Sequence, residues 1–221
     1  MALFPLILRM GCPYYERLWV ERIILEKQNL TPTFIGAWAI SPLSICDELI
    51  AYFETNKNKQ KKGVAGSGIN LDAKNSTDIR ITPKDMKLRG NEIFEEYFQR
   101  LYSCYQDYVT EWPFLTTFAG NLQISSFNLQ RYQSGQHFQN LHTERSSLAT
   151  LHRVFAWMTY LNDVDQEDGG STFFNHYDLA IQPTKGLTLI WPAEWTHAHR
   201  GNVLKANNKY IITGWMTFPN N

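Results

Sequence analysis

The chain has 221 residues, of which 43% are hydrophobic, so it is long enough to bury one sizeable core, and a single domain is the simplest expectation. Lys and Arg together number 21, as do Asp and Glu, so there is no net charge to draw the protein to nucleic acid or to an anionic membrane. The composition therefore excludes partners that are bound through bulk charge.

Cysteine usage and the apolar N-terminal segment bear on where the protein works. Cys12, Cys46 and Cys104 lie far apart and form no CxxC pair, so neither a disulfide framework nor a thiolate zinc site is indicated. The apolar run 1–8 has no basic segment before it and is too short to span a bilayer. We therefore expect a cytoplasmic protein with no membrane partner.

Two amphipathic helices are predicted in the first half of the chain, where apolar residues recur at helical spacing. The apolar positions of the first are Ile45, Leu49, Ile50 and Phe53, and those of the second are Ile93, Phe94, Tyr97, Phe98, Leu101, Tyr102 and Tyr105. The segment 57–68 between them is rich in lysine and glycine and lacks a periodic apolar face, which predicts an exposed loop.

From about Leu122 onward the chain changes to short runs rich in β-branched and aromatic residues, separated by Gly, Asn, Asp and Pro. The runs are Leu122–Tyr132, Val154–Leu161, Leu187–Trp191 and Tyr210–Phe218. This pattern is typical of an antiparallel sandwich or barrel. The helices that precede it indicate an α+β fold in which helices pack on one face of a sheet.

One domain is expected to span residues 41–221. Its part 41–119 is predicted to be mainly helical support, and its part 120–219 is predicted to be the β-rich core. Residues 1–40 are predicted to be an extension to this unit.

The most informative tripeptide is His142-Thr143-Glu144. Alternate residues of an extended segment point the same way, so the imidazole and the carboxylate converge on one point. A third ligand can come from His197 or His199. Two imidazoles and one carboxylate on one face of an octahedral ion leave the other positions open, which is the arrangement of non-haem iron(II). Zinc is the competing metal, because zinc hydrolases also use two histidines and a carboxylate.

Lys209 lies ten positions after His199 (209 − 199 = 10), and this spacing predicts a hairpin. If the connection turns at Asn207 and Asn208, Lys209 begins a strand that runs back beside His199. Its ammonium would then meet the distal carboxylate of a 2-oxo acid that chelates the metal. The ordinary alternative is a lysine on the surface.

Several motifs around these residues match the pattern of one family. They are Tyr132-x-x-Gly135-x-x-Phe138 before the His-x-Glu, the pair Tyr160–Val164 and Gly169–Phe173, His199-x-Gly201, and the segment from Lys209 to Trp215. Together they resemble the 2-oxoglutarate oxygenases of the prolyl 4-hydroxylase type. Only His199 has Gly201 and Lys209 at the spacings of this family, so the resemblance favours His199 over His197 as a ligand.

The resemblance implies a double-stranded β-helix, or jelly roll, supported by the N-terminal helices. It implies that iron(II) lies between the two sheets and is held by His142, Glu144 and His199. The cofactors implied are iron(II) and 2-oxoglutarate as cosubstrate, with ascorbate as an additional candidate.

The resemblance also assigns residues to the cosubstrate and the substrate. Lys209 and Thr172 would bind the distal carboxylate of 2-oxoglutarate, and Tyr132 would form a hydrogen bond with the cosubstrate. Arg153 and Trp215 match positions that lie near the peptide substrate in this family. The ordinary alternative is a core side chain for Trp215 and the end of a strand for Arg153.

Three departures from the family pattern stand out. Glu144 occupies the position where Asp is commoner, Arg200 replaces a small residue, and the proline expected near Asn202 and Val203 is missing. The last two weaken the match on the substrate side. Of the other histidines, His197 is expected either to contact a metal ligand or to lie at the rim of the site, and His137, His152 and His176 are assigned no role.

The implied reaction hydroxylates a C–H bond, with succinate and carbon dioxide as co-products. A peptidyl proline or another protein side chain is the expected substrate, and a free amino acid or other small molecule is the alternative. A nucleic-acid substrate is disfavoured, because the segment 209–215 lacks the arginines expected there. The rival functions are a non-catalytic jelly-roll binding module and, third, a zinc hydrolase.

Overall fold

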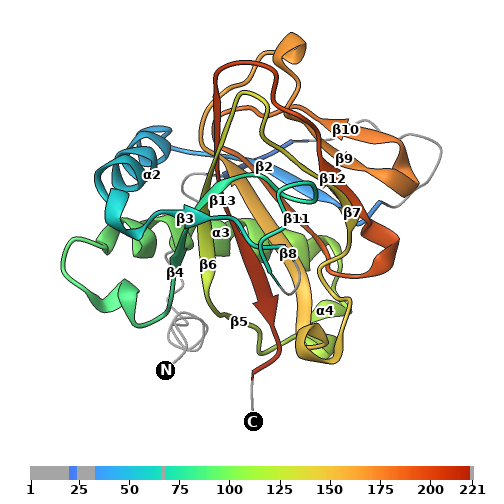
Figure 1. The fold of residues 1–221 in the computed structure, drawn as a ribbon. Helices are drawn as coiled ribbons and strands as arrows, with labels where there is room; N and C mark the ends of the chain where they lie inside the picture. The colour runs from blue at the N-terminus through green and yellow to red at the C-terminus, as the bar shows by residue number, and fades with distance from the viewer. Residues whose placement is uncertain (1–19, 24–32, 66–67, 220–221) are drawn as a thin grey trace.

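The computed structural model describes residues 20–23, 33–65 and 68–219. Two antiparallel sheets are formed by these residues, a larger one of nine strands and a smaller one of four. The helices cover the face of the larger sheet that points away from the smaller one (Figure 1). No described helix is long and apolar enough to cross a membrane.

The larger sheet runs in the order β1-β2-β11-β8-β13-β6-β4-β3, with β5 paired to β13. Its strands are β1 (Val20–Arg22), β2 (Gly36–Ile40), β3 (Lys61–Lys62), β4 (Thr77–Ile81), β5 (Gln123–Ile124), β6 (Phe127–Gln133), β8 (Arg153–Tyr160), β11 (Leu187–Pro192) and β13 (Asn208–Thr217). The smaller sheet runs in the order β10-β9-β12-β7. Its strands are β7 (Phe138–His142), β9 (Thr172–Phe174), β10 (Leu179–Ile181) and β12 (His199–Gly201).

Three α-helices are described, α2 (Ser44–Thr55), α3 (Glu92–Glu111) and α4 (Leu115–Phe118). Short 3-10 helices are η1 (Lys57–Lys59), η2 (Asp85–Lys87), η3 (Leu148–Thr150), η4 (Gln166–Asp168), η5 (Asn175–Tyr177) and η6 (Trp195–His197). The two predicted amphipathic helices are confirmed as α2 and α3. The apolar stripe of each faces the larger sheet, because that contact removes it from water.

The central strand β8 explains why both faces of the larger sheet are buried. Successive side chains of a strand point to opposite faces. Trp157 therefore packs among α3 aromatic rings, with Phe98 at a centroid distance of 5.7 Å, whereas Met158 and Tyr160 belong to the core between the two sheets. Gly214 on β13 leaves room for the indole of Trp157, because a Cβ there would lie 2.6 Å from Trp157 Cζ2.

The jelly-roll prediction is confirmed, and each of the four predicted β-rich runs overlaps a strand of the larger sheet. The predicted division of the chain differs from the sheet in two places. Gly36–Ile40, from the expected extension, pairs with β11 inside the larger sheet. Thr77–Ile81, from the span expected to be mainly helical, pairs with β6. The predicted loop 57–68 contains η1 and β3, and Cys12 lies outside the described residues.

Candidate metal centre and cosubstrate pocket

Two adjacent strands of the smaller sheet bring two histidines together. His199 on β12 is the register partner of His142 at the end of β7. Glu144 follows β7 by two residues, and the ligand atoms of the three side chains all lie within 4.8 Å of one another. Nε2 of His199 lies 3.4 Å and Nε2 of His142 lies 3.7 Å from Oε1 of Glu144. The predicted convergence of these residues is therefore present.

Backbone carbonyl groups fix which nitrogen of each imidazole faces the cluster. Nδ1 of His142 lies 2.8 Å from the carbonyl oxygen of Asn140, and Nδ1 of His199 lies 2.9 Å from that of His197. A carbonyl oxygen only accepts hydrogen bonds, so each Nδ1 carries the hydrogen and each Nε2 presents a lone pair. Both imidazoles are thus oriented to bind a metal through Nε2.

The charge state of the cluster suits a divalent cation. Burial lowers the pKa of His142 to about 4, so its imidazole is neutral at neutral pH. Burial raises the pKa of Glu144, but His199, His142 and Trp215 outweigh this effect and bring the pKa to about 2. Two imidazole nitrogens and one carboxylate form a donor set that suits iron(II), and zinc binds the same types of ligand. The residues present therefore fit the implied metal.

Glu144 is held in place by the two residues that were predicted to lie near the peptide substrate. Trp215 donates its indole N–H to Oε2 of Glu144 at 2.6 Å. Arg153 donates to the backbone oxygen of Glu144 at 2.8 Å, and its guanidinium lies 3.7 Å from the centre of the Trp215 ring. Oε1 is left to face the histidines. These contacts with the carboxylate could not be expected from the sequence.

A second set of contacts secures the segment that carries Glu144. Thr143 donates its hydroxyl hydrogen to the backbone oxygen of Ala193 at 2.8 Å, and Arg145 forms an ion pair with Glu194. Sequence analysis missed both contacts. About fifty positions separate the partners, and no motif links them.

Lys209 is buried, with 4% of its surface exposed, and not on the molecular surface. The predicted hairpin is wrong, because β12 lies in the smaller sheet and β13 in the larger, so Lys209 extends from the opposite sheet to the segment just before β9. Its ammonium donates to the backbone oxygen of Gly170 at 2.7 Å. Burial lowers its pKa to about 8, and no acidic side chain of the described residues forms an ion pair with it. A buried ammonium with two further donors is suited to an anionic ligand.

The other two predicted cosubstrate residues adjoin Lys209. Tyr132 on β6 is its register partner, and the ammonium of Lys209 lies 4.6 Å from the centre of the Tyr132 ring. Thr172 begins β9 two residues after Gly170, is buried, and accepts a hydrogen bond from the Tyr160 hydroxyl at 2.6 Å. The structure thus places all three predicted residues on the inner faces of the two sheets.

His197 is separate from the metal cluster. It belongs to η6, not to a strand as predicted, and its Nε2 contacts the backbone oxygen of Thr33 at 2.8 Å. Its own backbone oxygen orients His199. Burial lowers the pKa of His197 to about 4, which keeps it neutral. His197 is a buried structural residue that positions its neighbour.

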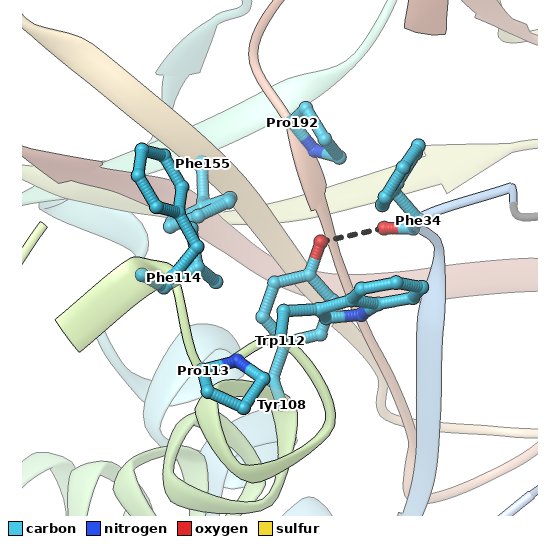
Figure 2. Close-up of a pocket in the computed structure, with 8 residues that line it drawn as sticks. Phe34, Tyr108, Trp112, Pro113, Phe114, Phe155 and Pro192 are labelled. Atoms are coloured by element: carbon cyan, nitrogen blue, oxygen red, sulfur yellow. Dashed lines mark hydrogen bonds between the residues drawn. The ribbon is translucent and has the colours of Figure 1, made fainter. Parts of the chain in front are cut away.

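An apolar pocket of about 260 Å³ lies elsewhere, on the helical side of the larger sheet (Figure 2). Aromatic and proline side chains line it, among them Phe34, Trp112, Phe114 and Phe155, and the Tyr108 hydroxyl donates to the backbone oxygen of Phe34 at 2.7 Å. None of its lining residues belongs to the metal cluster, and none carries a carboxylate or an imidazole. The pocket therefore has no part in the candidate metal chemistry.

Comparison with protein-family models identifies the segment that carries the cluster. Residues 127–217 match the model of the 2OG-Fe(II) oxygenase superfamily. The matched segment runs from β6 to β13 and includes the three candidate ligands and the three candidate cosubstrate residues. No curated protein sequence gives a significant match to the chain.

Solved structures of prolyl hydroxylases have a similar fold. The viral collagen prolyl hydroxylase from Paramecium Bursaria Chlorella virus-1 in complex with 2OG has a TM-score of 0.58 and 16% identity, with 90% of this chain and 95% of that chain covered. A prolyl-4-hydroxylase from Pseudomonas putida has a TM-score of 0.64 and 15% identity, with 83% and 92% covered. At such low identities, the similarity establishes the fold.

A third similar structure is a prolyl hydroxylase from Trichoplax adhaerens in complex with a hypoxia inducible factor oxygen degradation domain peptide fragment. Its TM-score is 0.64 at 16% identity, with 85% of each chain covered. The superfamily match implies iron(II) and 2-oxoglutarate, and it therefore favours iron over zinc at the cluster of histidines and glutamate. Residues 127–217 of this chain thus match the 2OG-Fe(II) oxygenase superfamily, and the chain has the fold of the prolyl hydroxylases.

Proposed function

We propose that this oxygenase hydroxylates a peptidyl proline or another protein side chain, with iron(II) held by His142, Glu144 and His199. One observation carries the proposal: two imidazoles and one carboxylate converge on one point, and the buried cation of Lys209 extends from the opposite sheet to Gly170. A binding module without catalysis has no need of three convergent metal-ligating groups. A zinc hydrolase has no need of the cation.

The protein's own groups position the reactants. When bound, iron(II) and 2-oxoglutarate supply the oxidising chemistry, in which dioxygen is consumed and succinate and carbon dioxide leave as co-products. Trp215 holds the Glu144 carboxylate so that Oε1 faces the histidines, and Arg153 holds the Glu144 backbone oxygen. Lys209 would pair with the distal carboxylate of the cosubstrate by charge-assisted hydrogen bonds, and the buried side chains around Lys209 would exclude water.

Apolar side chains near the cluster support a peptide as substrate. Leu148, Leu151 and Trp195 are 88%, 48% and 67% exposed, and they belong to the two segments that the Arg145–Glu194 ion pair joins beside Glu144. Exposed apolar side chains gathered near a polar centre are typical of interaction sites. The named activities of the similar structures, collagen prolyl hydroxylase and prolyl hydroxylase bound to a peptide, point to the same class.

The first experiment measures binding of both cofactors. The protein is titrated anaerobically with iron(II) and then with 2-oxoglutarate while absorption spectra are recorded. A metal-to-ligand absorption band is expected for the wild type and not for His142→Ala. His137→Ala is the matched control, because His137 precedes β7 and has no place in the cluster. Equal spectra for the wild type and His142→Ala would refute the proposed metal site.

The second experiment measures the substrate. Candidate proline-containing peptides and free amino acids are incubated with the loaded enzyme, succinate is quantified, and products are examined by mass spectrometry. A peptide that gains one oxygen atom supports the proposal. Oxygen gained only by a free amino acid would overturn the peptide assignment while leaving the oxygenase assignment intact.

A further inference from the structure

Buried polar side chains joined by hydrogen bonds, here called the polar network, connect the N-terminal half of the protein to the candidate cosubstrate residues Tyr132 and Lys209. Lys74, Ser76, Gln130 and Tyr132 are each no more than 5% exposed, and Asp78 joins them. Lys74, Ser76 and Asp78 lie on or just before β4, outside the segment that matches the oxygenase family model. The polar network ends at Tyr132, beside Lys209.

The hydrogen bonds of the polar network each have a defined donor and acceptor. Asp78 accepts from the ammonium of Lys74 at 2.7 Å, from the Ser76 hydroxyl at 2.7 Å and from the side-chain amide of Gln130 at 3.1 Å. A carboxylate only accepts, so Gln130 must turn its NH₂ group toward Asp78 and its carbonyl oxygen toward Tyr132. Tyr132 donates to that carbonyl oxygen at 2.9 Å.

The Tyr132 hydroxyl therefore uses its one hydrogen in the bond to Gln130. A phenol has one hydrogen to donate, and here it points to Gln130. A carboxylate of 2-oxoglutarate also only accepts, so the Tyr132 hydroxyl cannot donate to it while the bond to Gln130 persists. The part of Tyr132 that contacts Lys209 is instead the ring face, whose centre lies 4.6 Å from the ammonium.

We propose that Tyr132 serves the cosubstrate pocket as a positioning residue, whose hydroxyl is held by Gln130, Asp78 and Lys74 and whose ring face holds Lys209. This inference rests on the proposed function, because it concerns how Lys209 is presented to 2-oxoglutarate. A buried set of polar side chains joined by hydrogen bonds rigidifies its surroundings and fixes one arrangement of them. A buried ion pair, such as Lys74 with Asp78, is weak evidence for added stability, so a positioning role accounts for it better.

The test is a double-mutant cycle on 2-oxoglutarate affinity, measured by calorimetry on protein loaded with manganese(II) so that no turnover occurs. Gln130→Met removes the amide but keeps the Lys74–Asp78 pair, and Tyr132→Phe removes the hydroxyl but keeps the ring. Each is expected to weaken binding by about threefold to tenfold, the effect of one buried hydrogen bond. The double variant is expected to bind no more weakly than either single variant, since both break the same link.

Other outcomes would overturn the inference. If Tyr132→Phe weakens binding and Gln130→Met does not, the hydroxyl bonds directly to the cosubstrate. If the two effects add, Gln130 acts independently of the Tyr132 hydroxyl. If neither variant changes the affinity for 2-oxoglutarate, the polar network has no role in its binding. A wild type that binds no 2-oxoglutarate would instead refute the proposed function.

The role of Lys74, at the other end of the polar network, is tested by Lys74→Met, which is expected to weaken 2-oxoglutarate binding by a similar factor. Lys185→Met is the matched control, because Lys185 forms an ion pair of the same 2.7 Å length with Asp47 on the surface. Equal affinities of the two variants would remove Lys74 from the proposal. If Lys74→Met does not fold, the cycle at Gln130 and Tyr132 still decides whether Tyr132 is positioned in this way.

Discussion

The indole N–H of Trp215 lies 2.6 Å from Oε2 of Glu144, so one oxygen of the candidate metal ligand is held by a residue 71 positions away in the sequence. The bond fixes the rotation of the carboxylate and leaves Oε1 for the metal. Groups that orient ligands in this way contribute strongly to metal affinity.

Trp215→Phe is therefore expected to weaken metal affinity by about 10- to 100-fold, because the ring is kept and only the donor to Glu144 is lost. The measurement is a titration with manganese(II), followed by calorimetry. Trp195→Phe serves as the control, since Trp195 is 67% exposed and makes no contact with Glu144 among the described residues. Equal affinities of the two variants would show that the bond to Glu144 does not organise the site.

Lys209→Met is expected to weaken binding of 2-oxoglutarate by about 10- to 100-fold, the effect of losing a hydrogen bond to a charged group. Metal affinity should stay unchanged, because Lys209 lies in the opposite sheet from the candidate ligands. Calorimetry of the manganese-loaded protein gives both values. Lys205→Met, a change at an exposed residue of the same segment, is the control. A loss of metal affinity in Lys209→Met would contradict the separate roles of the two sheets.

The affinity for 2-oxoglutarate should also fall as the pH rises above about 8, because burial lowers the pKa of Lys209 to that value. Below this pKa the ammonium is charged and attracts the distal carboxylate, whereas above it the neutral amine does not. The dissociation constant is measured across this pH range. Lys209→Arg should flatten the profile, since a guanidinium stays charged throughout. A decline that persists in this variant would assign the titration to another group.

Gly170→Ala is expected to cost about 1 to 3 kcal/mol of unfolding free energy, because φ is +70° there and the new Cβ would lie 2.9 Å from Leu204 Cδ1. Gly135→Ala separates the two causes, since φ is +81° and a Cβ there would meet no atom within 4 Å. Urea unfolding should therefore show a smaller loss of unfolding free energy for Gly135→Ala than for Gly170→Ala. Equal losses would show that packing around Gly170 adds nothing.

The sequence predicted the elements well wherever a local pattern carries the signal. The helices α2 and α3 follow from apolar residues at helical spacing, and their stripes are buried in the structure. The strands β8, β11 and β13 follow from β-rich runs bounded by turn residues. The convergence of His142 with Glu144 was predictable because two residues separated by one position on an extended chain point the same way.

What the sequence could not predict depends on pairing between distant strands. The assignment of β12 and β13 to different sheets is an example, because the spacing of His199 and Lys209 alone also fits a hairpin. Asp78 contacts Gln130 because β4 pairs with β6, and no local sequence pattern predicts that pairing. The contact of Trp215 with Glu144 likewise needs the folded register of β13.

Lys209 starts from β13 of the larger sheet, and its ammonium reaches Gly170, just before β9 of the smaller sheet. The side chain thus crosses the space between the two sheets and links them. Its methylene groups set how far the positive charge lies from its own backbone, so a shorter cationic side chain at this position would hold the charge nearer to the larger sheet.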